Sequence, residues 1–154
     1  MTKYRILIVN GPNLGFLGKR QPEIYGTKGL DELPSLLKTL MGSQAEEIEL
    51  DFFQANGEGE LIDRLEKARE QEVQGLVLNA GAYTHTSLAL ADCLAWIGIP
   101  CMEVHLSNVW ARSEPLRQQS LIAKHCLGVV AGLGLMSYAL SVQALVHFLK
   151  KKDS

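Results

Sequence analysis

The 154-residue chain is 47% hydrophobic and 21% charged, a balance typical of a globular protein with a single core. Its net charge of −2 argues against non-specific nucleic-acid binding, which needs a basic face, and its apolar stretches fall short of the ~20 residues that a membrane span requires. We therefore expect one soluble domain over residues 1–154, with neither a nucleic-acid nor a membrane partner.

The cysteines and the N-terminus predict a cytoplasmic protein. Cys93, Cys101 and Cys126 are odd in number and form no CxxC motif, which favours reduced thiols over a disulfide framework. The first nine residues run directly into a strand-like pattern, without the separate apolar core and cleavage site of a signal peptide.

The first predicted elements alternate between strand and helix. A short β-branched run over 4–10 stops at Gly11-Pro12, as a buried strand would. Leucines at helical spacing predict a helix over 30–41, and an alternating pattern predicts a strand over 47–53. A helical pattern returns over 58–70.

The alternation continues to the end of the chain. The apolar run over 75–78 is typical of an interior parallel strand, and either Thr86 or Ser87 can cap a helix that extends to about Ile97. The remaining predicted elements are strands over 100–106 and 127–131 and a helix over 134–150. Five strands alternating with helices indicate an α/β protein with a parallel sheet covered on both faces.

Polar residues gather where such a sheet binds its ligands, in the loops after the carboxyl ends of the strands. Three of these loops, at 10–26, 79–87 and 103–117, carry most of the side chains able to exchange protons or hold an anion. The first has about 18 residues without an obvious element, and loops of such length often act as lids. The sequence therefore predicts a functional pocket at this edge.

Familiar motifs for other chemistry do not fit. Asn13 occupies the place of the first glycine in both the phosphate-binding GxxxxGK and the dinucleotide-binding GxGxxG patterns, and no GxSxG of a serine hydrolase occurs. No two histidines have helical metal-ligand spacing. Glu103 and His105 lie on one face of a predicted strand; such a pair could bind a metal, but a carboxylate that orients an acid–base histidine is the simpler interpretation.

Taken together, these segments resemble the type II 3-dehydroquinate dehydratases over nearly the whole chain. The matching stretches are Asn-Gly-Pro-Asn-Leu (10–14), Gly-x-Arg-x-Pro-x-x-Tyr-Gly (18–26), Glu-Gly-Glu-Leu-Ile-Asp (58–63), Asn-x-Gly-x-x-Thr-His-Thr-Ser (79–87), Glu-Val-His-x-Ser-Asn (103–108) and Gly-Leu-Gly (132–134). The resemblance implies a flavodoxin-like three-layer fold with a five-stranded parallel sheet and a homododecamer, a tetramer of trimers. It also implies cofactor-free and metal-free conversion of 3-dehydroquinate to 3-dehydroshikimate plus water, in the shikimate pathway of aromatic amino acid biosynthesis or in quinate breakdown.

The resemblance also implies roles for individual residues. Tyr25 matches the base that removes the proton beside the substrate ketone, and Arg20 matches the lid arginine next to it. His105 matches the acid that protonates the departing hydroxyl, with Glu103 beside it, and Asn13 matches the residue that holds a water against the enolate oxygen. Positions that match substrate-binding residues are Asn79, Gly81, His85, Leu106, Ser107 and Arg117, with Asp92 reaching the site of a neighbouring subunit.

These residue types suit the chemistry. A free tyrosine has a pKa of ~10, so forming its anion at neutral pH costs roughly 4 kcal/mol. A nearby guanidinium lowers such a pKa, and Arg20 lies five residues from Tyr25. Histidine has the right proton affinity to supply the departing hydroxyl with a proton.

Some positions depart from the family pattern. Gly57 and Trp110 stand where relatives usually carry histidine, the stretch 112–117 is one residue longer than usual, and Gln118-Gln119 replaces a more basic or histidine-bearing pair. The altered 112–119 segment keeps open the hypothesis of an inactive scaffold descended from the enzyme. The predicted topology alone is also compatible with a flavodoxin-like module that binds flavin or a mononucleotide.

Overall fold

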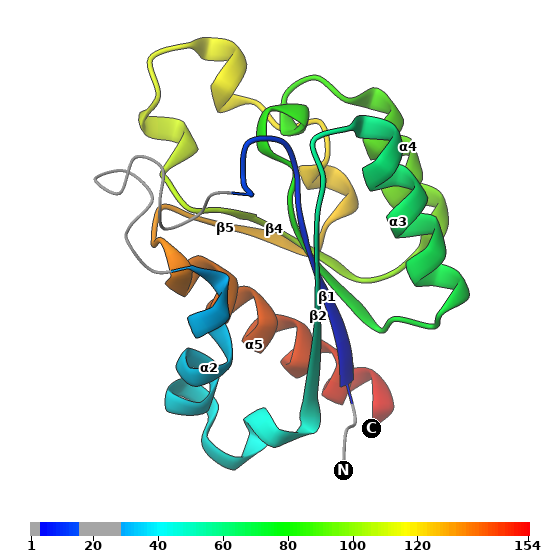
Figure 1. Cartoon of the computed structure of the whole chain (residues 1–154), viewed down its shortest axis with the longest axis vertical. Coiled ribbons are helices and arrows are strands. Elements are labelled where there is room, and N and C mark those ends of the chain that lie inside the picture. Colours follow the sequence, from blue (N-terminus) through cyan, green and yellow to red (C-terminus); the bar gives the residue numbers. More distant parts are fainter. Residues whose placement is uncertain (1–3, 16–28) are drawn as a thin grey trace.

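A computed structural model describes residues 4–15 and 29–154 and contains a three-layer α/β/α arrangement (Figure 1). Five parallel strands form one sheet in the order β2-β1-β3-β4-β5. This is the flavodoxin-like order, in which the strand order reverses between β1 and β3. The strands are β1 (Tyr4–Asn10), β2 (Ile48–Gln54), β3 (Gly75–Asn79), β4 (Cys101–His105) and β5 (Gly128–Ala131). The predicted fold class is confirmed.

Helices cover both faces of the sheet because the strand residues are apolar on both sides. The α-helices are α2 (Leu33–Met41), α3 (Glu58–Glu70), α4 (Leu88–Ile97) and α5 (Leu135–Asp153). Leu7 and Val9 of β1 join one core with α3 and α4, and Ile6 and Ile8 join the other with α2 and α5 (Figure 1). Short 3₁₀ helices are η1 (Leu30–Glu32), η2 (Gly42–Glu47), η3 (Gly81–Thr84), η4 (Val109–Ala111), η5 (Pro115–Gln118) and η6 (Ala123–His125).

Local chemistry explains where two of the predicted helices begin. Ser87, rather than Thr86, caps α4, because its Oγ accepts a hydrogen bond of 2.9 Å from the backbone N–H of Leu90. The last helix starts at Leu135, after Gly134 with φ 60°, and continues three residues beyond the predicted end at Lys150. None of the helices in the described ranges combines the length and apolar character that crossing a membrane demands.

Two glycines bring the loops after β1 and β3 into contact. The N–H of Gly11 donates to the carbonyl of Asn79 over 2.7 Å, and a Cβ at Gly11 would lie 2.5 Å from the carbonyl oxygen of Ala80. Gly81 has φ 59°, and a Cβ there would lie 3.1 Å from the carbonyl oxygen of Pro12. The absence of side chains at both positions therefore lets the two loops close over the strand ends.

Candidate active site

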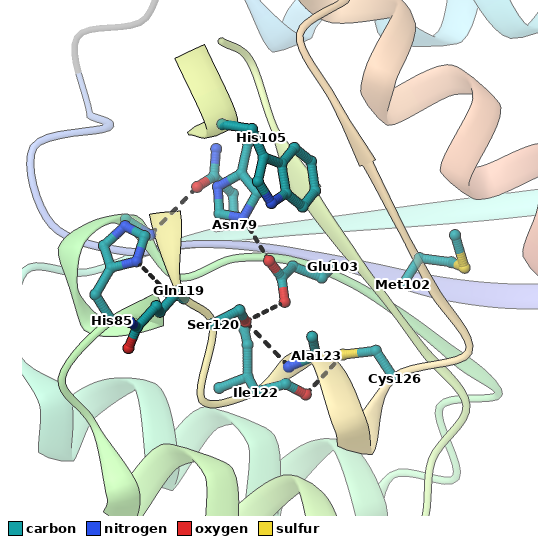
Figure 2. Close-up of polar contacts among 12 residues, drawn as sticks. Asn79, His85, Met102, Glu103, His105, Gln119, Ser120, Ile122, Ala123 and Cys126 are labelled. Carbon is teal, nitrogen blue, oxygen red and sulfur yellow. Dashed lines mark hydrogen bonds and ion pairs between the residues drawn. The ribbon is translucent and has the colours of Figure 1, made fainter. Parts of the chain in front are cut away.

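A buried acid–base pair lies at the end of β4. The Nε2 of His105 lies 2.6 Å from Oε2 of Glu103, and the two residues are only 4% and 1% exposed. The other carboxylate oxygen, Oε1, accepts a 2.6 Å hydrogen bond from the hydroxyl of Ser120, whose Oγ in turn accepts from the N–H of Ala123 (Figure 2). The pairing predicted for Glu103 and His105 is present, and Ser120 is an addition to it.

A second buried network fixes the amides at the ends of β1 and β3. Asn10 and Asn79 are register partners there, and the hydroxyl of Tyr138 from α5 bridges them, donating to Oδ1 of Asn10 over 2.5 Å and accepting from Nδ2 of Asn79 over 3.0 Å. Burial raises the pKa of the Tyr138 hydroxyl, and the bond from Asn79 offsets a part of that rise, so the phenol remains a neutral donor. Oδ1 of Asn79 accepts from the N–H of Gly81 over 3.2 Å.

His85 is buried beside these groups and has one free ring nitrogen. Its Nδ1 lies 2.5 Å from the backbone carbonyl of Gln119, and because a carbonyl only accepts, Nδ1 carries the proton (Figure 2). In the neutral ring Nε2 is then an acceptor. It is buried and has no hydrogen-bond partner among the described residues. His85 is thus arranged to accept a hydrogen bond from a ligand, such as a hydroxyl group.

Asn13 lies in the exposed part of the loop after β1, in a left-handed conformation with φ 67°. Its N–H donates to Oδ1 of Asn56 over 3.1 Å, and Nε2 of Gln54 donates to both Asn56 Oδ1 and the carbonyl of Gly11. Gln54 and Asn56 were not among the predicted site residues. Their place after β2, at the same sheet edge, is the signal that could have identified them.

Two arginines of the 103–117 region have different surroundings. Nη2 of Arg112 donates to the hydroxyl of Ser107 over 3.0 Å, whereas Arg117 forms an exposed 3.2 Å ion pair with Glu114. Leu106, beside Ser107, is buried. Arg112 therefore contacts Ser107, a predicted substrate-binding residue, whereas the substrate-binding role predicted for Arg117 stays a prediction.

Asp92 is exposed on α4, between Leu88 and Trp96, which lie one turn before and after it and are 68% and 53% exposed. Tyr25 and Arg20 lie outside the described residues.

A hollow of about 520 Å³ adjoins the cluster at Asn10, a volume suited to a small molecule. Its lining combines residues at the ends of β1 and β2 with those flanking 16–28: Asn10, Leu14, Gly15, Gly29, Leu30, Asp31, Phe52, Phe53 and Gln54.

The thiols of Cys93 and Cys101 are unsuited to nucleophilic catalysis. Burial, followed by the charge of Glu66, raises the pKa of Cys93 to about 11. A hydrogen bond with Cys126 and then burial raise the pKa of Cys101 well above its usual value. Both thiols therefore stay protonated near neutral pH, and a protonated thiol is a poor nucleophile.

Comparisons with known proteins agree on one family. The model of the family "Dehydroquinase class II" matches residues 4–146. A 3-dehydroquinate dehydratase of Carboxydothermus hydrogenoformans is 47% identical over 150 residues, covering 97% of this chain and 95% of the relative. One of an Exiguobacterium species is 48% identical over 150 residues, covering 97% and 99%. The crystal structure of a type II dehydroquinase from Butyrivibrio crossotus superposes with a TM-score of 0.83 at 38% identity, covering 93% of this chain and 97% of that one.

Proposed function

Because the chain belongs to the class II dehydroquinase family, we propose that it is a hydro-lyase that converts 3-dehydroquinate to 3-dehydroshikimate and water. The observation that carries this proposal is the buried Glu103–His105 pair at the carboxyl edge of the sheet, next to the amide of Asn79 and the unpartnered Nε2 of His85. Such an arrangement offers one proton donor and several hydrogen-bonding groups to a small polyhydroxylated acid.

In the proposed reaction, the Tyr25 phenolate removes the proton next to the substrate ketone, and the electrons of that C–H bond form an enolate. Arg20 stabilises the phenolate through its permanent positive charge. Asn13 holds a water molecule against the enolate oxygen, where charge develops. The exposed, left-handed position of Asn13 at the strand end supports its access to a ligand.

His105 then supplies the proton with which the substrate's hydroxyl departs as water, while the enolate electrons form the new C=C bond and restore the ketone. Its Nε2 is engaged with Glu103, so we assign the transferred proton to Nδ1. The Glu103 carboxylate stabilises the imidazolium before transfer. The reaction is redox-neutral, and its proposed proton transfers need neither a metal nor an organic cofactor.

The proposed substrate-binding residues are Asn79, Gly81, His85, Leu106, Ser107 and Arg117. His85 is proposed to accept a hydrogen bond from a substrate hydroxyl, since its Nε2 has a lone pair but no proton to offer a carboxylate. Tyr138 and Gly81 hold the Asn79 amide from both ends, so its orientation is set before any ligand arrives.

Single substitutions test the roles of Arg112 and Arg117. We expect Arg112→Ala to raise KM by roughly 10-fold, because its charged hydrogen bond holds the hydroxyl of Ser107, a proposed substrate-binding residue. Arg117→Ala is expected to raise KM as well, since the proposal has Arg117 leave Glu114 for the substrate. Steady-state kinetics of both variants, with Glu114→Ala as the matched control for the ion pair, measure these effects. An unchanged KM in Arg117→Ala would remove that residue from the substrate site.

We further propose a cytoplasmic homododecamer, a tetramer of trimers, in which Asp92 reaches a neighbouring subunit. The exposure of Leu88 and Trp96 on either side of Asp92 supports a protein contact on this face of α4. Sedimentation equilibrium measures the assembly mass, and a monomer at micromolar concentration would exclude it. The proposed pathway role is aromatic amino acid biosynthesis or quinate breakdown.

A direct assay tests the proposed function. Purified protein, without additives, should convert 3-dehydroquinate to a conjugated enone whose absorption appears in the near ultraviolet. Substrate binding without turnover would instead identify an inactive scaffold, and tight retention of flavin would identify a nucleotide-binding module.

A further inference from the structure

We infer that Ser120 is a positioning residue that sets the proton-donating strength of the Glu103–His105 pair. The inference rests on the proposed function, because the pair acts on the substrate there. Ser120 belongs to none of the motifs singled out in the sequence; it follows η5 and lies 17 residues beyond Glu103.

The hydrogen bonds of Ser120 direct its hydroxyl proton toward Oε1 of Glu103. The N–H of Ala123 donates to Oγ over 3.0 Å, which occupies a lone pair of the oxygen. The 2.6 Å contact with Oε1 of Glu103 must then use the hydroxyl proton, because a carboxylate only accepts. The hydroxyl is therefore a fixed donor to the carboxylate, not a freely rotating group.

The backbone around Ser120 is anchored on both sides. The carbonyl of the preceding residue, Gln119, accepts from Nδ1 of His85, and the N–H of the following residue, Leu121, donates to the carbonyl of Thr84 over 2.9 Å (Figure 2). Both anchors belong to the loop after β3, so Ser120 is held between that loop and β4. This preorganisation means that the donor need not be ordered during the reaction.

Among the described residues, each carboxylate oxygen of Glu103 has one side-chain partner: Ser120 at Oε1 and His105 at Oε2. With the carboxylate only 1% exposed, water cannot readily replace a lost donor. Without the Ser120 hydroxyl, the carboxylate would attract the proton shared with His105 more strongly. The pair would then hold its proton more tightly, which makes it a weaker acid toward the substrate.

The expected signature is a change in both rate and pH dependence. Ser120→Ala should lower kcat about tenfold or more, the effect of one hydrogen bond to a charged group, with KM within about twofold of the parent. The alkaline limb of the kcat profile, which reports loss of the acid's proton, should move to higher pH. Ser120→Thr keeps the hydroxyl and should restore both properties.

The comparison of these variants keeps the surrounding charges constant. Among the residues that the structure describes, the titratable groups near Glu103 include His105 and Cys101 on β4, Cys126, which hydrogen-bonds Cys101, and His85 after η3. All of them are present in the alanine and threonine variants alike. Loss of the bond to Ala123 in Ser120→Ala could weaken η6, so thermal unfolding of each variant is measured alongside the kinetics.

The decisive experiment records kcat and KM for 3-dehydroquinate across pH in the parent, Ser120→Ala and Ser120→Thr, with Ser120→Cys replacing the alanine variant if that does not fold. Thiols are weak donors, so Ser120→Cys should resemble Ser120→Ala. An unshifted alkaline limb in Ser120→Ala, or a Ser120→Thr variant as slow as alanine at equal stability, overturns the inference while the parent's activity upholds the proposed function. A parent without dehydratase activity would overturn both.

Discussion

Tyr25→Phe is expected to lower kcat for 3-dehydroquinate by about 10²- to 10⁴-fold, the usual contribution of a positioned base. Phenylalanine keeps the ring but has no oxygen to receive the proton next to the ketone. The proposed roles predict that this loss appears at every pH, because no ionisable group takes the place of the phenol. Continuous absorbance of the enone product measures the rate.

Binding and folding separate loss of the base from loss of the site. Tyr25→Phe should bind a non-reactive analogue of the substrate, one that lacks the acidic proton, with a dissociation constant within about fivefold of the parent's. The reason is that the proposed contacts with the substrate come from Asn79, His85 and Ser107. Its unfolding temperature should match the parent's. A variant that folds, binds and still turns over at the parental rate would reject Tyr25 as the base.

His105→Ala is expected to abolish most activity and also to destabilise the fold. The substitution removes the proposed acid, worth about 10²- to 10⁴-fold in kcat. It also leaves the buried Glu103 with Ser120 as its one remaining side-chain donor among the described residues. A buried carboxylate that loses a hydrogen-bond donor costs about 1–3 kcal/mol of unfolding free energy or more. Denaturant unfolding and the enone assay measure the two effects separately.

The matched control is the double variant His105→Ala with Glu103→Gln. Glutamine is close in shape to glutamate but neutral, so it removes the uncompensated charge and should recover part of the lost unfolding free energy. The same double variant should remain as inactive as His105→Ala. Recovery of activity together with stability would mean that His105 supports the structure without supplying the proton.

Much of the fold follows from local patterns in the sequence. Apolar runs and alternation located all five strands, and the serine cap of α4 was one of two alternatives at neighbouring positions. These features depend on residues within a few positions of each other. Since parallel strands share one carboxyl edge, the gathering of Asn79, His85 and His105 at that edge also followed from the strand order.

Ser120 could not be predicted, because its partner Glu103 is distant in sequence and no strand end precedes it. Gln54 and Asn56 stand at a predicted strand end, which marks their edge of the sheet, but their partners Gly11 and Asn13 appear only once the chain is folded. Which arginine contacts Ser107 could not be predicted for the same reason. Sequence spacing offers both Arg112 and Arg117, and only the path of the chain through η4 and η5 determines which one contacts Ser107.

The hydrogen bond between Tyr138 and Asn10 joins residues 128 positions apart, from the first strand to the last helix. A ribosome synthesises β1 long before α5, and a domain generally folds as a unit. Asn10 and Asn79 are therefore synthesised well before Tyr138, the residue that bridges their amides. Chains released before Tyr138 would carry the acid–base pair of β4 but lack this buried bridge, so premature termination should yield protein that is readily removed by proteolysis.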